Sequence, residues 1–341
     1  MTKKKILTAV AATVAVTVIA VGISLFHMAY YDRKTPNFLD ETELYVTPGM
    51  DADALLDILA PHCRKIASLR RAFRELGVPR PGHYVVSTSH SSAYVARMLA
   101  FGWQTPVKLV LSGSIRSRDV LVSKIAAQMM ADSSEVASAL DDGMLLDSLG
   151  MRRNCLLAYF IPDTYELYWT DSAASVISRM KREYDSFWNG DRLSKAAALG
   201  LEPMEVSVVA SIVTGETNHV PEMPAIAAVY LNRLRLGMKL QADPTVAYCF
   251  DYKPGRILNE HLKVDSPYNT YLYPGLPPGP ICAPSKAALE AVLSPDSHSY
   301  LYFCASPDFD GTHRFASTYA EHLRNAREFH AALSRRQRDG A

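Results

Sequence analysis

The longest uninterrupted apolar segment of the chain lies close to its first residue. No charged residue occurs from Ile6 to Phe26, and a run of this length allows a helix to cross the hydrocarbon core of a membrane. Lysines at positions 3–5 precede the run, and the pair Tyr30–Tyr31 follows it, where aromatic side chains favour the membrane surface. We therefore expect a transmembrane helix over 6–27, with residues 1–5 in the cytoplasm and the remainder of the chain exported.

A cleaved signal peptide is the alternative for this segment. The apolar run is long for the central part of a signal peptide, and no clear A-x-A cleavage site follows it. Arg33 and Lys34 on the far side reduce the charge asymmetry that sets orientation. The pattern favours the uncleaved anchor.

The pattern after the anchor predicts two folded regions and an α+β fold class. Residues 28–43 include a polar stretch with Pro36 and are expected to form a tether. Residues 44–132 alternate short strands with short helices, which is typical of a small α+β module. Residues 133–158 are mainly helical and polar and are expected to link this module to a larger mixed α+β domain over 159–341.

Several elements of both regions are predicted from their apolar periodicity. In the first region we expect strands over Leu44–Thr47, His83–Ser87 and Val107–Leu111, and helices over Ile66–Leu76, Ala93–Phe101 and Val120–Met130. In the second we expect helices over Ala173–Trp188 and Pro224–Leu236, and a hairpin formed by Tyr300–Ala305 and Thr312–Phe315. No Ser or His of the first region stands in a nucleophile-elbow or triad context, so a binding or spacing role is expected there.

The stretch from Glu202 to Thr217 predicts a helix that delivers a carboxylate to the edge of the core. Pro203 suits the first helical turn. The apolar residues that follow recur at the spacing of one buried helix face: Met204, Val208, Val209 and Ile212. Glu216 lies on the same face, four residues beyond Ile212. Lost hydration there would raise its pKa and retain a proton near neutral pH, as a general acid requires. The alternative is a helix-end acid that faces water.

Composition excludes several classes of function. The formal net charge of +1 gives no reason to expect a nucleic-acid partner. The five cysteines are scattered and odd in number, and the ten histidines form no ligand spacing such as HExxH. We therefore expect no metal site and no cofactor.

Two polar stretches after the Glu216 helix are candidates for ligand binding. Gln241 and Asp243 flank a turn, where Asp243 can cap a short helix, face the same cleft as Glu216, or do both. The stretch Ser266–Ile281 combines three tyrosines with five prolines; the prolines make the loop rigid, and the tyrosines offer flat faces for sugar rings. A purely structural loop would show the same composition.

Four consecutive segments resemble the MltG (YceG-like) family of endolytic murein transglycosylases. These are ASIVTGET, VYLNRLRLGMKLQADPTVAY, SPYNTYLYPGLPPGPI and YLYFCASPDFDGTHRFASTYAEH. They occur in the family's order and spacing, within a match from about Phe160 to about Glu328. The region 44–132 looks like a diverged version of the family's LysM-like module.

The resemblance implies cleavage within peptidoglycan glycan strands, between N-acetylmuramic acid and N-acetylglucosamine, without hydrolysis. Glu216 matches the family's catalytic glutamate and would act as acid and then as base, so that the muramyl C6 hydroxyl attacks C1. The residues expected around the glycan are Asn232, Gln241, Asp243, Thr245, Tyr268, Asn269 and Tyr271. The implied location is a bacterial inner membrane, with the catalytic domain on the periplasmic side and peptidoglycan synthases as possible partners.

Two alternative functions, and three departures from the family pattern, stand beside this interpretation. A muramidase would hydrolyse the same bond and would need a second acid, for which Asp243 is the candidate. A catalytically inactive peptidoglycan-binding partner of wall synthesis is favoured by Thr214, where the family commonly has an acid. Gly215 stands where the family has a polar residue, and Ser285 where it commonly has glycine.

Overall fold

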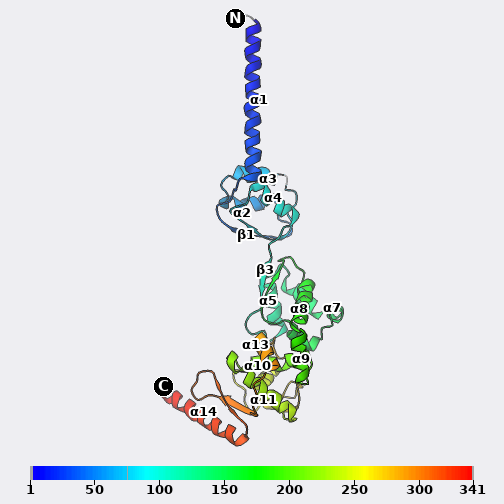
Figure 1. Ribbon diagram of the computed structural model, residues 1–341, viewed down its shortest axis with the longest axis vertical. Coiled ribbons are helices and arrows are strands. Elements are labelled where there is room, and N and C mark those ends of the chain that lie inside the picture. Colours follow the sequence, from blue (N-terminus) through cyan, green and yellow to red (C-terminus); the bar gives the residue numbers. More distant parts are fainter. Residues whose placement is uncertain (1–2, 75, 340–341) are drawn as a thin grey trace. The chain divides into compact units, whose positions relative to one another are not determined.

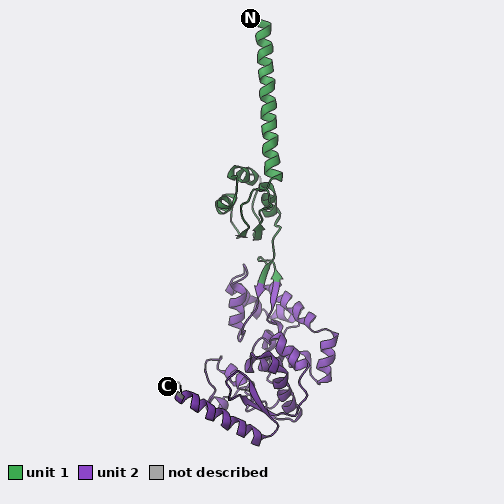
Figure 2. Cartoon of the chain, turned by 60° about the vertical axis from the view of Figure 1, so that its left-hand side comes forward, with its two compact units in different colours: residues 1–108, 166–171 green, residues 109–165, 172–341 purple. Residues whose placement is uncertain are grey.

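The structure is a computed structural model that describes residues 3–74 and 76–339 (Figure 1). The chain divides into two compact units, one formed by residues 1–108 with 166–171 and the other by 109–165 with 172–341 (Figure 2). Both contain helices and small two-stranded sheets, which confirms the predicted α+β class.

Unit 1 begins with α1 (Lys3–Lys34), which includes the whole predicted span. Within the described part of the chain, α1 is the unbroken helix that has the length and hydropathy to cross a membrane. The remaining elements are β1 (Thr42–Val46), α2 (Ala52–Leu59), η1 (Ala60–His62), α3 (Ile66–Phe73), β2 (Gly82–Val86) and α4 (Ser92–Phe101). β1 and β2 pair antiparallel, with Thr42 opposite Val86 and Val46 opposite Gly82.

The stretch predicted as a tether is packed onto unit 1. The helix continues to Lys34, beyond the predicted end of the span, and Phe38 is fully buried in a cluster with Leu44 and Leu69. Asn37 is fully buried too. A mostly polar composition suggested a linker, but one phenylalanine and the hydrogen bonds of one asparagine are enough to fix this segment. The LysM-like character of the module remains a prediction.

The boundaries between the units fall within β3 (Val107–Val110) and β4 (Thr164–Leu167). Unit 2 then contains α5 (Arg118–Ala126), α6 (Ser133–Asp141), α7 (Gly143–Ser148) and η2 (Arg153–Tyr159). Val136, Leu140 and Leu146 of α6 and α7 are buried. The residues expected to be a linker are therefore part of this compact unit, as is α5, which was expected in the first module.

The remaining elements of unit 2 are α8 (Ala173–Phe187), α9 (Gly190–Ala198), α10 (Pro203–Glu216), η3 (Val220–Glu222), α11 (Met223–Arg235), α12 (Asp243–Cys249), η4 (His261–Lys263), α13 (Lys286–Leu293), β5 (Tyr302–Ala305), β6 (His313–Ala316) and α14 (Tyr319–Asp339). β5 and β6 form the predicted antiparallel hairpin.

Helix α10 is the centre of unit 2. It packs against α11, α12, α13, α9 and η2. Every residue from Val206 to Val213 is buried, so the helix is enclosed on all sides rather than along the one predicted stripe. Enclosure fixes the direction of the helix, and hence the place where its last residue, Glu216, emerges.

Candidate active site

Glu216 lies at the carboxyl end of α10, where the backbone leaves the helical conformation. Thr217 is extended, with a φ of −147°, so the helix ends at Glu216. At the other end of α10, the carboxylate of Glu205 accepts a hydrogen bond of 2.8 Å from the backbone of Glu202. The Glu216 side chain is half-buried.

A tyrosine holds the Glu216 carboxylate. The hydroxyl of Tyr230, on α11, donates a hydrogen bond of 2.5 Å to Oε1 of Glu216. Tyr230 is only 1% exposed, and its ring lies perpendicular to that of Phe303 with the centroids 6.0 Å apart. The ring therefore has little freedom, and it fixes the orientation of the carboxylate.

The surroundings of Glu216 raise the pKa of its carboxyl to near neutrality. Burial raises the pKa of its carboxyl to about 7, against the hydrogen bond from Tyr230, which lowers the pKa. The negative charge of Asp243 raises the pKa further, while Arg233 opposes it. The sequence-based expectation of a raised pKa agrees with this environment.

Glu216 lines two cavities of unit 2. The first has a volume of about 320 Å³; its walls are formed by Glu216, Tyr230, Arg233, Leu240, Gln241, Asp243, Tyr271, Tyr302, Phe303, Tyr319 and His322. The second, of about 750 Å³, extends from Glu216 past Thr217 and Asn218 to His313 and Phe329. An extended ligand could therefore lie on both sides of the Glu216 carboxylate.

Asp243 is brought to Glu216 by a close contact between α12 and α10. A Cβ atom on Gly215 would lie 2.8 Å from Cβ of Pro244, so the missing side chain lets the start of α12 approach α10. The expectation that Asp243 caps this helix is wrong, because the N-cap residue is Ala242 and no side chain caps there. Asp243 instead accepts a hydrogen bond of 2.6 Å from the hydroxyl of Tyr271.

Gln241 reaches the same cavity from a strained backbone. Its φ of 50° lies in the left-handed region, which is costly for a residue with a side chain. The backbone N–H of Gln241 donates to the carbonyl of Thr270 at 3.1 Å, and that of Ala242 donates to the hydroxyl of Thr270 at 3.0 Å. These bonds hold the turn that presents Gln241 and Asp243 together.

Thr245 and Asn269, which were expected to contact the ligand, are fully buried and support the cavity from behind. The hydroxyl of Thr245 donates to the carbonyl of Ala242 at 2.7 Å. The amide of Asn269 donates to the carbonyls of Leu262 and Val264 at 3.0 and 2.8 Å, and its oxygen accepts from the backbone of Tyr271 at 3.0 Å. Asn269 therefore holds Tyr271 in place, and Thr245 holds the turn at Ala242, rather than binding a ligand.

Two other expected residues do not line either cavity. Asn232 donates to the carbonyls of His298 and Tyr300 at 3.0 and 3.1 Å, and so supports the chain before β5. Tyr268 packs against Tyr248, with the ring centroids 4.5 Å apart. Of the predicted set, the first cavity gathers Glu216, Gln241, Asp243 and Tyr271.

Several cavity residues were missed by the sequence interpretation. Arg233 is 7% exposed, and its guanidinium donates to the carbonyls of Leu301 and Leu240, each at 2.6 Å. In the sequence, the signal for Arg233 is that this charged residue interrupts the apolar stripe of α11.

His322 is a second cavity residue that the sequence did not indicate. Its ring stacks on Tyr302, and its buried Nδ1 has no partner among the described residues. Burial and the charge of Arg233 lower its pKa. His322 thus brings an uncharged ring with a free nitrogen to the cavity.

Two of the three departures from the family pattern, Thr214 and Ser285, contact each other. The hydroxyl of Thr214 accepts a hydrogen bond of 3.2 Å from the backbone of Ser285 and donates to the carbonyl of Ala210 at 2.8 Å. The hydroxyl of Ser285 caps α13 by accepting from Ala288 at 3.1 Å. Thr214 therefore joins α10 to α13, and it is not among the residues that line the Glu216 cavities.

The fold and site define a protein with one half-buried, proton-retaining carboxylate in a tyrosine-rich cavity of an α+β unit. The model of the YceG-like family matches residues 44–328, and the chain belongs to this family. The resemblance seen in the sequence is thereby confirmed.

Known relatives share part of their length with this chain. The endolytic murein transglycosylase of Bacillus subtilis (strain 168) is 30% identical over 217 residues, which are 59% of this chain and 59% of that protein. The endolytic murein transglycosylase of Streptococcus pneumoniae serotype 2 (strain D39) is 31% identical over 193 residues, 54% of this chain and 35% of that protein. The chain thus covers less than two thirds of the length of either relative.

A crystal structure of a yceG-like protein from Listeria monocytogenes matches a larger part of this chain. It is 25% identical, the TM-score is 0.56, and the match covers 84% of this chain and 99% of that one.

Proposed function

We propose that this chain is an endolytic lytic transglycosylase that cleaves peptidoglycan glycan strands between N-acetylmuramic acid and N-acetylglucosamine. The observation that carries the proposal is Glu216, whose pKa of about 7 leaves a proton available at neutral pH in a cavity rich in tyrosines. The names of the Bacillus and Streptococcus relatives support the same activity.

In the proposed reaction Glu216 acts first as an acid and then as a base. Its carboxyl proton passes to the glycosidic oxygen, the bond from that oxygen to the muramyl C1 breaks, and the N-acetylglucosamine unit leaves as an alcohol. The resulting carboxylate then takes the proton of the muramyl C6 hydroxyl, whose oxygen bonds to C1. The product is a 1,6-anhydro end, no water is consumed, and Glu216 regains its proton.

Cleavage within a strand requires that saccharides extend on both sides of the scissile bond. Glu216 lines two cavities, so a strand could occupy both while its middle lies against the carboxylate. Gln241 and His322 in the first cavity, and Asn218 and His313 in the second, carry groups able to bond hydroxyl and acetamido groups. This arrangement supports an endolytic rather than an end-specific enzyme.

Asp243 is the group through which the same site could act as a muramidase. A hydrolase of this kind needs a second carboxylate that activates water or attacks C1. One oxygen of Asp243 is engaged by Tyr271, and its charge raises the pKa of Glu216. We assign Asp243 to keeping Glu216 protonated, and the ends of the products distinguish the two mechanisms.

The inactive alternative depended mainly on the missing acid at position 214. Because Thr214 bonds Ser285 and does not line the cavities of Glu216, the substitution concerns the packing of α10 on α13. This favours an active enzyme. The cellular setting is part of the proposal: α1 anchors the chain as a single span, the remaining chain lies on the extracytoplasmic face of a bacterial membrane, and peptidoglycan synthases are candidate partners.

Product analysis tests the proposed activity. Full-length protein in detergent is incubated with uncrosslinked glycan strands, and the fragments are analysed by mass spectrometry. We expect internal fragments that end in 1,6-anhydro-N-acetylmuramic acid. Reducing ends would identify a muramidase instead, release of disaccharides from strand ends alone would contradict an endolytic enzyme, and intact strands would favour the binding partner.

Replacing Tyr230 by phenylalanine should move the alkaline limb of the pH profile of kcat/KM to higher pH. The substitution keeps the ring but removes the hydrogen bond that lowers the pKa of Glu216, so the acid should remain protonated to a pH about one unit higher. The measurement is kcat/KM from about pH 5 to 9, a range that brackets the raised pKa of the acid.

Tyr271→Phe is the matched control, because it removes a hydroxyl that bonds Asp243 rather than Glu216. Its alkaline limb should move less than that of Tyr230→Phe. Equal displacement in both variants would mean that the hydrogen bond from Tyr230 does not set the pKa that limits the rate.

A further inference from the structure

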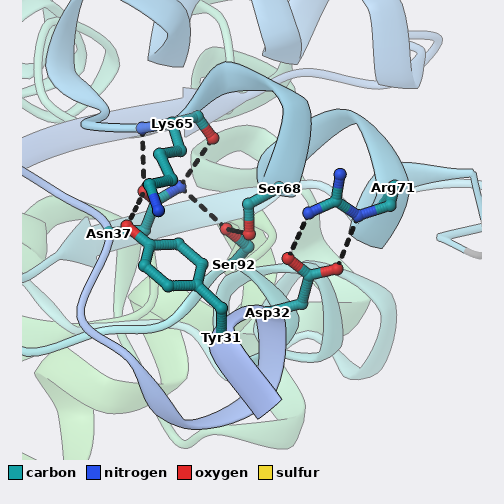
Figure 3. A network of polar contacts seen from close by, with 7 residues as sticks. All are labelled: Tyr31, Asp32, Asn37, Lys65, Ser68, Arg71 and Ser92. Atoms are coloured by element: carbon teal, nitrogen blue, oxygen red, sulfur yellow. Dashed lines mark hydrogen bonds and ion pairs between the residues drawn. The ribbon is translucent and has the colours of Figure 1, made fainter. Parts of the chain in front are cut away.

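The end of α1 is fixed to unit 1 by charged and polar contacts (Figure 3). Asp32, in the last turn of α1, accepts two hydrogen bonds of 2.8 Å from the guanidinium of Arg71 on α3. The hydroxyl of Ser91 donates to the backbone carbonyl of Arg33 at 3.0 Å. α1 therefore continues beyond its apolar run into a rigid junction, and the start of α3 has a defined place beside it.

Asn37 holds the residues immediately before α3. It is fully buried, its amide donates to the carbonyl of Lys65 at 3.1 Å, and its side-chain oxygen accepts from the backbone of Lys65 at 2.9 Å. The backbone carbonyl of Asn37 also accepts from Arg64 at 2.7 Å. Two consecutive cationic residues are thus held by their backbones at this junction, while their side chains are exposed (Figure 3 shows the contacts of Lys65).

A cavity of about 610 Å³ lies between α1 and the start of α3. It is lined by Ser24, His27, Met28, Tyr31, Arg64, Lys65, Ile66, Ala67, Ser68 and Arg71. The wall from α1 begins inside the apolar run and ends at Tyr31. The cavity therefore occupies the level at which the hydrocarbon of a membrane would give way to headgroups.

The opposite wall of this cavity carries positive charge that the protein does not neutralise. Arg71 is paired with Asp32, but among the described residues neither Arg64 nor Lys65 has a carboxylate partner. The ammonium of Lys65 lies 3.9 Å from the centre of the Tyr31 ring, which directs it over α1. Two available cations therefore border a cavity whose other wall is formed by Ser24, Met28 and the rings of His27 and Tyr31.

We propose that this cavity binds the headgroup of an anionic phospholipid, with the phosphate between Arg64 and Lys65 and the acyl chains along α1. A phosphate with attached hydrocarbon matches both walls, since the cations would bind the phosphate and the apolar face of α1 would contact the chains. The inference rests on the proposed membrane anchoring and is independent of the chemistry at Glu216. Bound lipid would hold unit 1 at the membrane surface.

Native mass spectrometry of the full-length protein, released from detergent in the presence of phosphatidylglycerol or phosphatidylcholine, tests the site. The variant Arg64→Gln/Lys65→Gln should retain about tenfold less phosphatidylglycerol than the wild type, and its retention of phosphatidylcholine should be unchanged. The matched control is Arg70→Gln/Arg74→Gln, which removes the same charge from the α3 region at residues that line a different cavity. Its retention of phosphatidylglycerol should fall by less than about twofold.

The outcomes distinguish a lipid site from a general effect of charge, from a site for free phosphate, and from a failure of the proposed anchoring. Equal loss in both double variants, or no loss in the first, would overturn the site and indicate a general effect of charge. Displacement of the lipid by millimolar inorganic phosphate would show that the site recognises free phosphate rather than a lipid. Release of the wild type from membranes by alkaline carbonate would overturn the anchoring on which the site rests, whereas the cleavage assay reports on the Glu216 proposal separately.

Discussion

Replacement of Glu216 by glutamine should remove strand cleavage while the fold remains intact. Glutamine keeps the shape of the side chain and can still accept the hydrogen bond of Tyr230, but it has no proton to give to a glycosidic oxygen. We expect kcat/KM to fall by about a thousandfold, within the range that general acid catalysis contributes. Release of anhydro-ended fragments by the full-length variant, measured by mass spectrometry, provides the test.

Glu205→Gln is the matched control on the same helix. Glu205 accepts a hydrogen bond from Glu202 at the amino end of α10, and glutamine can make the same contact. This variant should cleave strands at the rate of the wild type. Activity retained by Glu216→Gln would remove Glu216 from the reaction and leave Asp243 as the remaining carboxylate of the first cavity.

The Glu216→Gln variant should also differ from the wild type in how its free energy of unfolding depends on pH. The pKa of Glu216 rises from 4.5 to about 7 on folding, so the folded state binds the proton more tightly than the unfolded state. Stability from this proton is present below about pH 4.5 and is lost as the pH rises through about 7. Glu216→Gln should therefore gain about 1–3 kcal/mol relative to the wild type between about pH 5 and pH 8.

Urea unfolding of both proteins in detergent at these two pH values measures the gain. A variant whose stability follows the wild type at both values would mean that the Glu216 carboxylate is as well solvated in the folded protein as in the unfolded chain.

Local patterns in the sequence were sufficient to predict that Glu216 lies at the end of a helix and that its pKa is raised. The helix over Glu202–Thr217 followed from its apolar spacing and Pro203, and partial burial at the end of such a helix was enough to predict a raised pKa. The turn that contains Gln241 and Asp243 was also predicted. Polar residues beside a proline favour a turn, and such a turn lies near a cleft or near solvent.

The partners of Glu216 could not be predicted in this way. Tyr230 fits the apolar spacing of α11 as an ordinary core residue would, since a hydroxyl directed at a carboxylate and one directed at a backbone carbonyl leave the same pattern in the sequence. Tyr302 and His322 reach the cavity from β5 and α14, which are remote in the chain. Asn269 and Thr245 illustrate the converse, because a buried polar side chain that supports a loop resembles one that binds a sugar.

Replacement of Gly279 by alanine should produce the largest loss of stability, because its surroundings leave no room for a side chain. A Cβ atom there would lie 2.0 Å from the backbone oxygen of Asn154, and the side chain of Asn154 is itself held by a hydrogen bond of 2.6 Å to the carbonyl of Pro278. Since a backbone atom cannot move aside as a flexible side chain can, the loop or η2 must shift. We expect a loss of about 3 kcal/mol in the free energy of unfolding.

Gly275→Ala in the same loop separates this contact from backbone strain. Gly275 has a φ of 83°, and no atom lies within 4 Å of the position that a Cβ would take, so alanine there should cost about 1 kcal/mol through its backbone conformation alone. Urea unfolding of the full-length variants in detergent gives both values. Because the loop also carries Tyr271, Gly279→Ala should reduce cleavage as well, whereas equal losses in the two variants would show that strain rather than the contact with Asn154 governs this loop.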